Sequence, residues 1–141
     1  MSATADHAET SLAVRLGFQP GQVVQEIGYD DDVDHDLRES IEETIGSELV
    51  DEDYDDVADV VLLWFRDEDG DLTDALVDAI GLLEEGGLIR LLTPKTGRDG
   101  YIEPSDINDA AQTAGLSQAK SVSVGKDWND TKLQTPKGSK R

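Results

Sequence analysis

Three residues in the first half of the chain have the types and spacing of a cofactor site: Glu26, Gly28 and Asp51. Glu26 and Gly28 end an apolar segment at residues 23–28, and Asp51 follows another at residues 47–50. Parallel strands in these places would bring all three to the carboxyl edge of a sheet, where open α/β sheets bind ligands. A structural interpretation competes with this one, because an isolated Glu-x-Gly motif has low specificity and Gly28 can simply permit a tight turn.

A second group of side chains offers oxygen and nitrogen ligands for a metal ion. Carboxylate oxygens suit calcium or magnesium, and an imidazole adds a nitrogen ligand. The group consists of Asp30, Asp32, Asp34, His35 and Asp36. We favour a solvated acidic cap at the start of a helix, because charge runs usually face water. The acidic run at residues 67–71 is not a calcium loop, since Phe65 and Leu76 would occupy its first and last ligand positions.

The remaining chemistry is sparse. The two histidines, His7 and His35, lie in no nucleophile motif, and no phosphate-binding loop is present. A basic and aromatic loop at residues 95–101 could bind an anion or a peptide, although we favour simple exposure. It contains Lys95, Arg98 and Tyr101. Trp64 and Phe65 end the most apolar segment, where they line a crevice or, as we favour, pack in the core.

Charge is distributed unevenly along the 141 residues. Residues 1–93 contain 26 acidic and 4 basic side chains, whereas residues 94–141 contain 6 and 8. The acidic part disfavours direct contact with nucleic acid or an anionic membrane, and favours either solubility alone or a basic protein partner. The absence of cysteine excludes disulfides and thiolate chemistry. No apolar run approaches the roughly 18 residues of a membrane span. We expect no signal peptide and a cytoplasmic location.

Apolar periodicity predicts the elements that position these residues. We expect strands at residues 22–28, 47–50, 58–65, 88–93, 119–124 and 128–133. We expect helices at residues 33–46, from residue 72 to the glycine pair at 86–87, and at residues 104–115. Residues 1–16 are predicted to form a mobile N-terminal arm, residues 17–134 a single α/β domain, and residues 135–141 a disordered basic tail.

This order resembles a shortened class I methyltransferase fold, which is Rossmann-like. The likeness rests on residues 23–28 as a first strand with acidic-x-glycine, residues 82–88 as a helix, glycine turn and strand, and a final antiparallel pair. The whole chain is also similar to a family of small acidic actinobacterial proteins of unknown function. The resemblance implies an open, mostly parallel sheet with helices on both faces and an antiparallel C-terminal edge.

The resemblance further implies S-adenosylmethionine as the cofactor, with Glu26, Gly28 and Asp51 at matching positions. Three departures count against it. Tyr29 and the aspartates at residues 30–32 replace the further glycines of that fold, the connector before residue 58 is too short for another strand–helix unit, and the methyl-acceptor motif is absent. A carboxylate ligand beside these aspartates would be repelled by about 1 kcal/mol per close pair in water and by more in a dry site.

We therefore predict a non-catalytic methyltransferase-like domain that acts as a protein-binding or regulatory module and uses no cofactor. A protein partner, basic if the acidity is functional, would bind it. One alternative is an S-adenosylmethionine-dependent methyltransferase with an atypical loop. The other is an acidic mimic of nucleic acid that occupies a basic partner.

Overall fold

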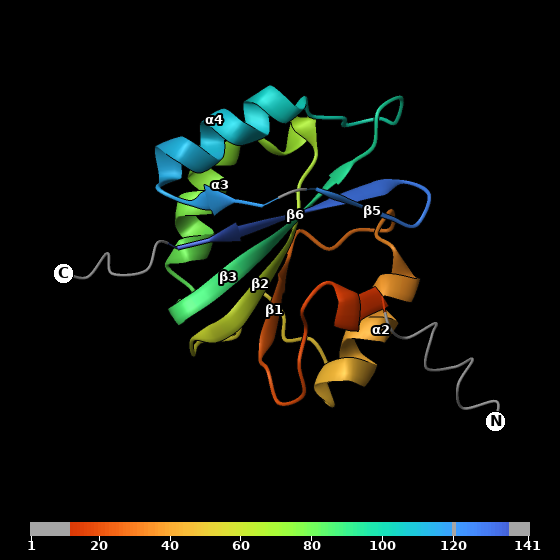
Figure 1. Ribbon diagram of the computed structural model, residues 1–141, viewed down its shortest axis with the longest axis vertical. Helices are drawn as coiled ribbons and strands as arrows, with labels where there is room; N and C mark the ends of the chain where they lie inside the picture. Colours follow the sequence, from red (N-terminus) through yellow and green to blue (C-terminus); the bar gives the residue numbers. More distant parts are fainter. Residues whose placement is uncertain (1–11, 120, 136–141) are drawn as a thin grey trace.

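The computed structural model describes residues 12–119 and 121–135, which form a six-stranded sheet with helices on both faces (Figure 1). The strands are β1 (Val24–Ile27), β2 (Ala58–Trp64), β3 (Leu83–Pro94), β4 (Ser117–Gln118), β5 (Val122–Val124) and β6 (Trp128–Gln134). The main helices are α2 (His35–Ile45), α3 (Leu72–Ile80) and α4 (Pro104–Ala114), and a 3₁₀ turn covers Asp67–Asp69. No helix in this described part of the chain is long and apolar enough to cross a membrane.

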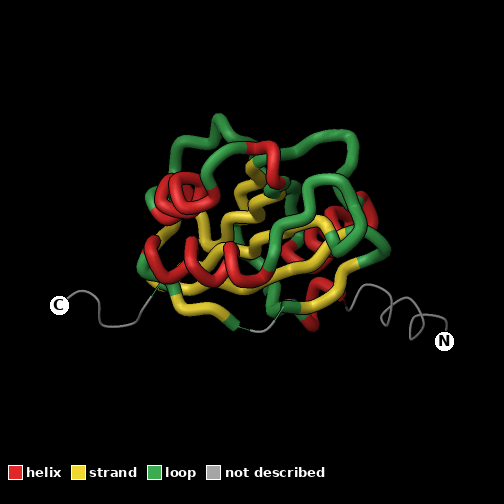
Figure 2. Tube along the Cα trace, turned by 90° about the horizontal axis from the view of Figure 1, so that it is seen from above, coloured by secondary structure: helices red, strands yellow, loops and turns green. Residues whose placement is uncertain are grey.

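The sheet is mostly parallel, as predicted. Its order is β1-β2-β3-β6-β4, and β5 also pairs with β6. β1, β2 and β3 pair in parallel, whereas β6 runs antiparallel to β3, β4 and β5. Figure 2 shows the strands as a central layer between helices. The predicted antiparallel C-terminal edge is therefore confirmed.

Two hydrophobic cores lie on the two faces of the sheet, one under α2 and the other under α3 and α4 (Figure 1). Successive residues of β2 enter them alternately. Leu62 and Trp64 belong to the core with α2, and Val61 and Leu63 belong to the core with α3 and α4. Because both faces are covered, β2 is apolar apart from Asp59 and shows no alternation.

Helix α2 is built as its sequence predicts. The core under α2 buries the apolar stripe of this helix. The stripe consists of Val33, which lies just before the helix, and of Leu37, Ile41 and Ile45. Asp34 caps the helix by accepting a hydrogen bond of 2.9 Å from the Leu37 amide, and Gly46 ends it in a left-handed conformation.

The boundary between α3 and β3 differs from the prediction. α3 ends at Ile80 and β3 already begins at Leu83, so the helix does not reach residues 86–87. The pairing with β2 slips between Ala58 and Val60, which face Leu83 and Leu88. At Gly87 a Cβ atom would lie 2.9 Å from the Asp59 carbonyl oxygen, so the glycine allows the strands to approach closely at this bulge. The glycine pair therefore belongs to a strand irregularity and not to a helix end.

Two predicted strands are shorter than expected. Residues 47–50 contribute only an isolated parallel bridge, in which Val50 pairs with Gln25 of β1. The expected strand at residues 119–124 is split into β4 and β5, which both pair with β6. Within β5 only Val124 is buried, so the predicted alternation of Val122 and Val124 does not place both on a covered face.

The predicted arm needs a boundary nearer the N-terminus than residue 16. Residues 12–15 are helical, and Ala13, Leu16 and Phe18 are buried in the core with α2. The Ala13 amide also donates a hydrogen bond of 3.2 Å to the Ser40 hydroxyl. Residues 1–11 of the predicted arm and residues 136–141 of the predicted tail lie outside the described residues.

A buried ion pair joins β3 to β6. The Arg90 guanidinium donates to the Asp130 carboxylate at 2.9 Å, and both side chains are almost fully buried. The second carboxylate oxygen of Asp130 has no hydrogen-bond partner among the residues that the structure describes. Burial, only partly offset by Arg90, raises the pKa of Asp130 to about 6. The pair with Asp130, forty residues away in sequence, therefore explains why a charged residue interrupts the apolar pattern of β3.

Candidate functional site

The carboxyl ends of β1 and β2 lie next to each other at the expected site. Ile27 pairs with Leu63 in parallel register, which brings Gly28 beside Trp64. Gly28 has a φ of +86°, and a Cβ atom there would collide with the Trp64 carbonyl oxygen. Glycine is therefore required for backbone packing between the two strands, independently of any ligand.

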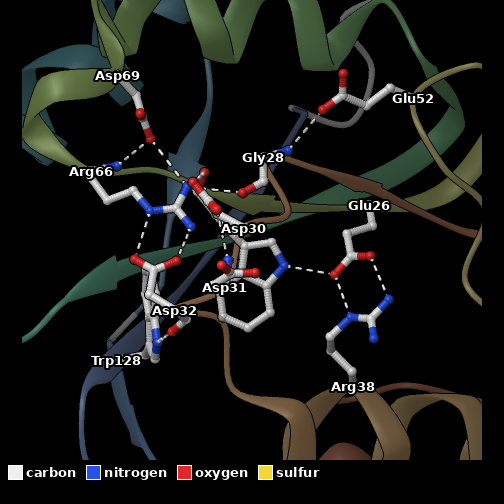
Figure 3. A network of polar contacts seen from close by, with 11 residues as sticks. Glu26, Gly28, Asp30, Asp31, Asp32, Arg38, Glu52, Arg66, Asp69 and Trp128 are labelled. Atoms are coloured by element: carbon white, nitrogen blue, oxygen red, sulfur yellow. Dashed lines mark hydrogen bonds and ion pairs between the residues drawn. The ribbon is translucent and has the colours of Figure 1, made fainter.

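Both backbone polar groups of Gly28 are bound by side chains of the protein itself (Figure 3). Its amide donates to Glu52 Oε2 at 3.1 Å. Its carbonyl oxygen accepts from Arg66 Nη1 at 2.9 Å. A ligand that needs this amide would have to displace Glu52.

Arg66, at the end of β2, holds the acidic loop that follows Gly28 (Figure 3). Its guanidinium donates to both carboxylate oxygens of Asp32, at 3.1 and 2.5 Å, and to Asp69 at 3.2 Å. The hydrogen bond from Arg66 is the main reason that the pKa of Asp32 is lowered. Burial alone favours the neutral guanidinium, but the bonds to Asp32 and Asp69 outweigh it, so the pKa of Arg66 is raised.

The acidic loop is also tied to the C-terminal edge of the sheet. The Trp128 indole donates to the Asp32 carbonyl oxygen at 3.0 Å, and the Arg66 guanidinium lies 5.3 Å from its ring centroid. Trp128 meets Trp64 edge-to-face, with ring centroids 4.9 Å apart. The loop is consequently held by side chains from β2 and β6.

Glu26 is a buried acceptor with its partners already in place. Arg38 of α2 donates to its two oxygens at 2.7 and 2.8 Å, and the Trp64 indole donates at 2.9 Å. The hydrogen bond to Glu26 is the main reason that the pKa of Arg38 is raised. Arg38 also lies 4.8 Å from the ring centroid of Tyr29. These hydrogen bonds join β1, β2 and α2, so Glu26 has a structural role.

Glu26 and Asp51 line a common pocket of about 420 Å³ at the edge of the sheet. The other lining residues are Tyr29, Arg38, Glu52 and Asp53. Gly28 lies beside this pocket through its bond to Glu52. The structure thus brings the three predicted cofactor-site residues into one region, in a pocket that has four carboxylates and one cation already paired with Glu26.

The residues around Gly28 do not fit the methionine end of S-adenosylmethionine. In the fold that the chain resembles, glycine amides approach the carboxylate at that end of the cofactor. Here the Gly28 amide is bound by Glu52, and the neighbouring loop carries the carboxylates of residues 30–32. Glu52 and these aspartates would repel an anionic ligand group.

The predicted acidic group does not converge as metal ligands would. Asp32 pairs with Arg66 and Asp34 caps α2, as expected for a helix cap. Within residues 12–119 and 121–135, no three acidic or histidine side chains are grouped closely enough to hold a metal ion. The interpretation as a solvated cap is therefore the better one for this group.

The other sequence candidates have structural partners. Lys95 donates to the Gly125 carbonyl oxygen at 2.8 Å, and Arg98 pairs with Asp127 at 2.9 Å, so the basic loop is tied to the turn between β5 and β6. Trp64 and Phe65 are 1% and 4% exposed, in agreement with core packing.

Sequence reasoning missed the two arginines that organise this edge, Arg38 and Arg66. A usable signal was their scarcity, because residues 1–93 contain only four basic side chains. Three of the four form ion pairs with carboxylates: Arg38, Arg66 and Arg90. In so acidic a segment, an arginine directly after a buried strand is a strong candidate for such a pair.

The fold recurs among solved methyltransferase structures. A SAM dependent methyltransferase from Aquifex aeolicus superposes with a TM-score of 0.54 and 13% identity, over 89% of this chain and 88% of that one. The mycolic acid cyclopropane synthase CmaA1, complexed with SAH and CTAB, gives a TM-score of 0.62 and 12% identity, over 96% and 86%. At such low identity the likeness shows the fold alone.

Sequence relatives indicate the family. The uncharacterized protein Mb2263c of Mycobacterium bovis is 53% identical over 133 residues, which are 94% of this chain and 83% of that protein. The uncharacterized protein Rv2239c of Mycobacterium tuberculosis matches with the same identity and coverage. Residues 13–137 match the family model described as "Protein of unknown function (DUF3052)". The fold resembles that of class I methyltransferases, and the chain belongs to the DUF3052 family.

Proposed function

We propose that this protein is a non-catalytic, methyltransferase-like module that works by binding a protein partner. One observation carries the proposal: the amide and the carbonyl of Gly28, where a cofactor would be cradled, are both bound by the protein's own side chains. The cradle is closed by Arg66, which is buried and whose guanidinium makes four further hydrogen bonds to described residues besides the one to Gly28: two to Asp32 and one each to Asp69 and Trp64. With its cofactor cradle closed in this way, the protein acts through its surface, by binding a partner.

The excess of carboxylates favours a partner with basic character. The formal net charge is −20, and complementary charge increases association rates and selects partners. Such a complex is expected to weaken as the salt concentration rises, because exposed charges are screened over about 8 Å at physiological ionic strength.

An S-adenosylmethionine-binding protein is the second candidate, and the pocket at Glu26 and Asp51 favours it. Asp51 is exposed, and within the described residues only one of its carboxylate oxygens accepts a hydrogen bond, from the Asp53 amide at 3.0 Å. The other oxygen is available for a ribose hydroxyl. Binding through this pocket would need a methionine end that avoids the closed cradle.

A mimic of nucleic acid is less well supported. Mimicry requires carboxylates along one surface, as in a phosphate backbone. Here acidic side chains line one pocket beside α2, which includes Glu39 and Glu43, and another beside α3 and α4, which includes Asp71 and Asp106. These helices cover opposite faces of the sheet (Figure 1).

Calorimetric titration with S-adenosylmethionine and with S-adenosylhomocysteine separates the two candidates. For the proposed module we expect no heat of binding at millimolar ligand, with the wild-type protein. The second candidate instead requires binding that Asp51→Asn weakens and that Glu84→Gln, an exposed control of equal charge change, leaves intact. Binding with that pattern would refute the closed cradle.

Affinity capture from the native cell tests the binding role itself. We expect one partner that forms a defined complex when both proteins are purified and mixed, and that dissociates as salt is raised. A chain that remains monomeric and captures no reproducible partner across a range of salt concentrations would count against the module.

A further inference from the structure

A cleft of about 320 Å³ lies on the opposite face from α2, between the end of β2 and the helices α3 and α4. We call it the α3–α4 cleft. Apolar side chains contribute to its lining: Phe65, Leu72, Ile102 and Ala110. Phe65, Ile102 and Ala110 also belong to the second core, against which Leu72 packs, so this apolar floor is continuous with the core.

Four aspartates surround that floor. They are Asp67, Asp71, Asp106 and Asp109, and all four are exposed. No lysine, arginine or histidine of the described part of the chain lines the cleft. The ion pairs found in the described part of the chain involve other carboxylates, so these four have no cationic partner there.

The cleft therefore keeps a strong negative charge. The four aspartates give the rim a formal charge of −4. The N-termini of α3 and α4 each offset about half a charge. About three uncompensated negative charges remain beside an apolar floor.

Two comparisons point to the kind of occupant. The pocket at Glu26 contains its own cation, Arg38, and the pocket beside the end of α2 is lined by four glutamates, a glycine and a serine, without an apolar side chain. The α3–α4 cleft, by contrast, combines an apolar floor with a rim of aspartates that form no ion pair within the described residues. Its aspartates do not converge on one point as metal ligands would, since no such group occurs within the described residues. This combination fits a long cationic side chain, which has an aliphatic stem and a charged end.

We propose that the α3–α4 cleft is the docking site for a lysine or arginine side chain on a basic, amphipathic segment of the partner protein. The aliphatic stem lies on the floor formed by Phe65 and Leu72, and the cation lies among the rim aspartates. This inference rests on the proposed binding function and names the chemistry of the partner.

The test uses a fluorescent peptide of alternating lysine and leucine, with a glutamate–leucine peptide of equal length for comparison. Fluorescence anisotropy measures binding to the full chain and to two double variants. Asp106→Asn with Asp109→Asn removes two rim charges, whereas Glu39→Gln with Glu43→Gln removes two charges from α2. Both variants change exposed residues and shift the net charge equally.

We expect the lysine peptide to bind and the rim variant to weaken it about tenfold, as two exposed charge contacts of roughly 0.7 kcal/mol each would do. The α2 variant should change the affinity less than about twofold, because α2 covers the opposite face of the sheet and exposed charges are screened by salt. If both variants weaken peptide binding equally, the peptide is attracted by the overall negative charge, and the cleft is not its binding site. Equal affinity for the glutamate peptide would likewise overturn the cleft.

Amide chemical shifts provide a readout that does not depend on the variants. Peptide binding should perturb Leu72, Thr73 and Thr113, which line the cleft, and leave the amides of α2 unchanged. Perturbation confined to α2 would refute the assignment. Binding of S-adenosylmethionine would overturn the proposed function but not this result, whereas a captured partner that ignores the rim variant would overturn the cleft alone.

Discussion

Replacement of Arg66 should loosen the loop that closes the cradle. Arg66→Met keeps an apolar stem but removes the guanidinium, which donates to the carbonyl oxygens of Gly28 and Trp64 and to two aspartates. Loss of the two carbonyl contacts costs about 1 kcal/mol each. The Asp32 pair adds no more than about 1 kcal/mol, because the Asp32 side chain is 54% exposed and solvent screens it. We therefore expect the free energy of unfolding to fall by about 3 kcal/mol.

Urea denaturation followed by tryptophan fluorescence is the appropriate assay. The chain has two tryptophans, Trp64 and Trp128, and both contact this network. Arg66→Lys should recover less than half of the loss, because an ammonium group cannot make the planar, forked contacts. Asp32→Asn is the matched control and should cost less than about 1 kcal/mol. An unfolding free energy of Arg66→Met within about 1 kcal/mol of the wild-type value, or an equal loss in Asp32→Asn, would refute this role of Arg66.

The remaining predictions concern the strand packing and the buried ion pair. Gly28→Ala should cost about 3 kcal/mol, because its left-handed backbone is strained and its Cβ collides with Trp64; Gly21→Ala, with the same φ but open space, should cost only about 1 kcal/mol in the same denaturation assay. Asp130 has a raised pKa when folded, so it binds its proton more tightly in the folded state than in the unfolded state. Its contribution to stability is therefore fully present below pH 4 and lost as pH rises through about 6. The difference in unfolding free energy between wild type and Asp130→Asn should change in that window by up to about 3 kcal/mol. A difference independent of pH would show that Asp130 stays ionised beside Arg90.

The elements that sequence patterns predicted well are those whose signal is local. The four-residue spacing from Val33 to Ile45, an aspartate before it and a glycine after it specify α2 almost to the residue. The apolar run from Val60 to Trp64 in β2 likewise indicates a strand covered on both faces. Periodicity and capping act within a few residues, so they can be read without knowing the fold.

The elements that were misplaced depend on pairing with distant strands. The glycine pair at residues 86–87 has the appearance of a helix end, yet Gly87 serves the close approach of β3 to β2 near Asp59. Residues 47–50 have strand-like composition but form only one parallel bridge to β1, between Val50 and Gln25. The extent of each of these strands depends on its pairing register with the neighbouring strand, which the sequence of a single segment does not specify.

The candidate site shows the same division. From its sequence alone this chain can be recognised as an acidic, mostly parallel α/β domain with a carboxylate-rich loop after Gly28. Only the tertiary structure determined that Arg66 lies against Asp32, thirty-four residues away, and that Trp128 meets the same loop across ninety-six residues. The physical reason is that local spacing governs which backbone conformation a segment adopts, whereas the charges and rings that close the cradle come together only when β1, β2 and β6 are aligned in one sheet.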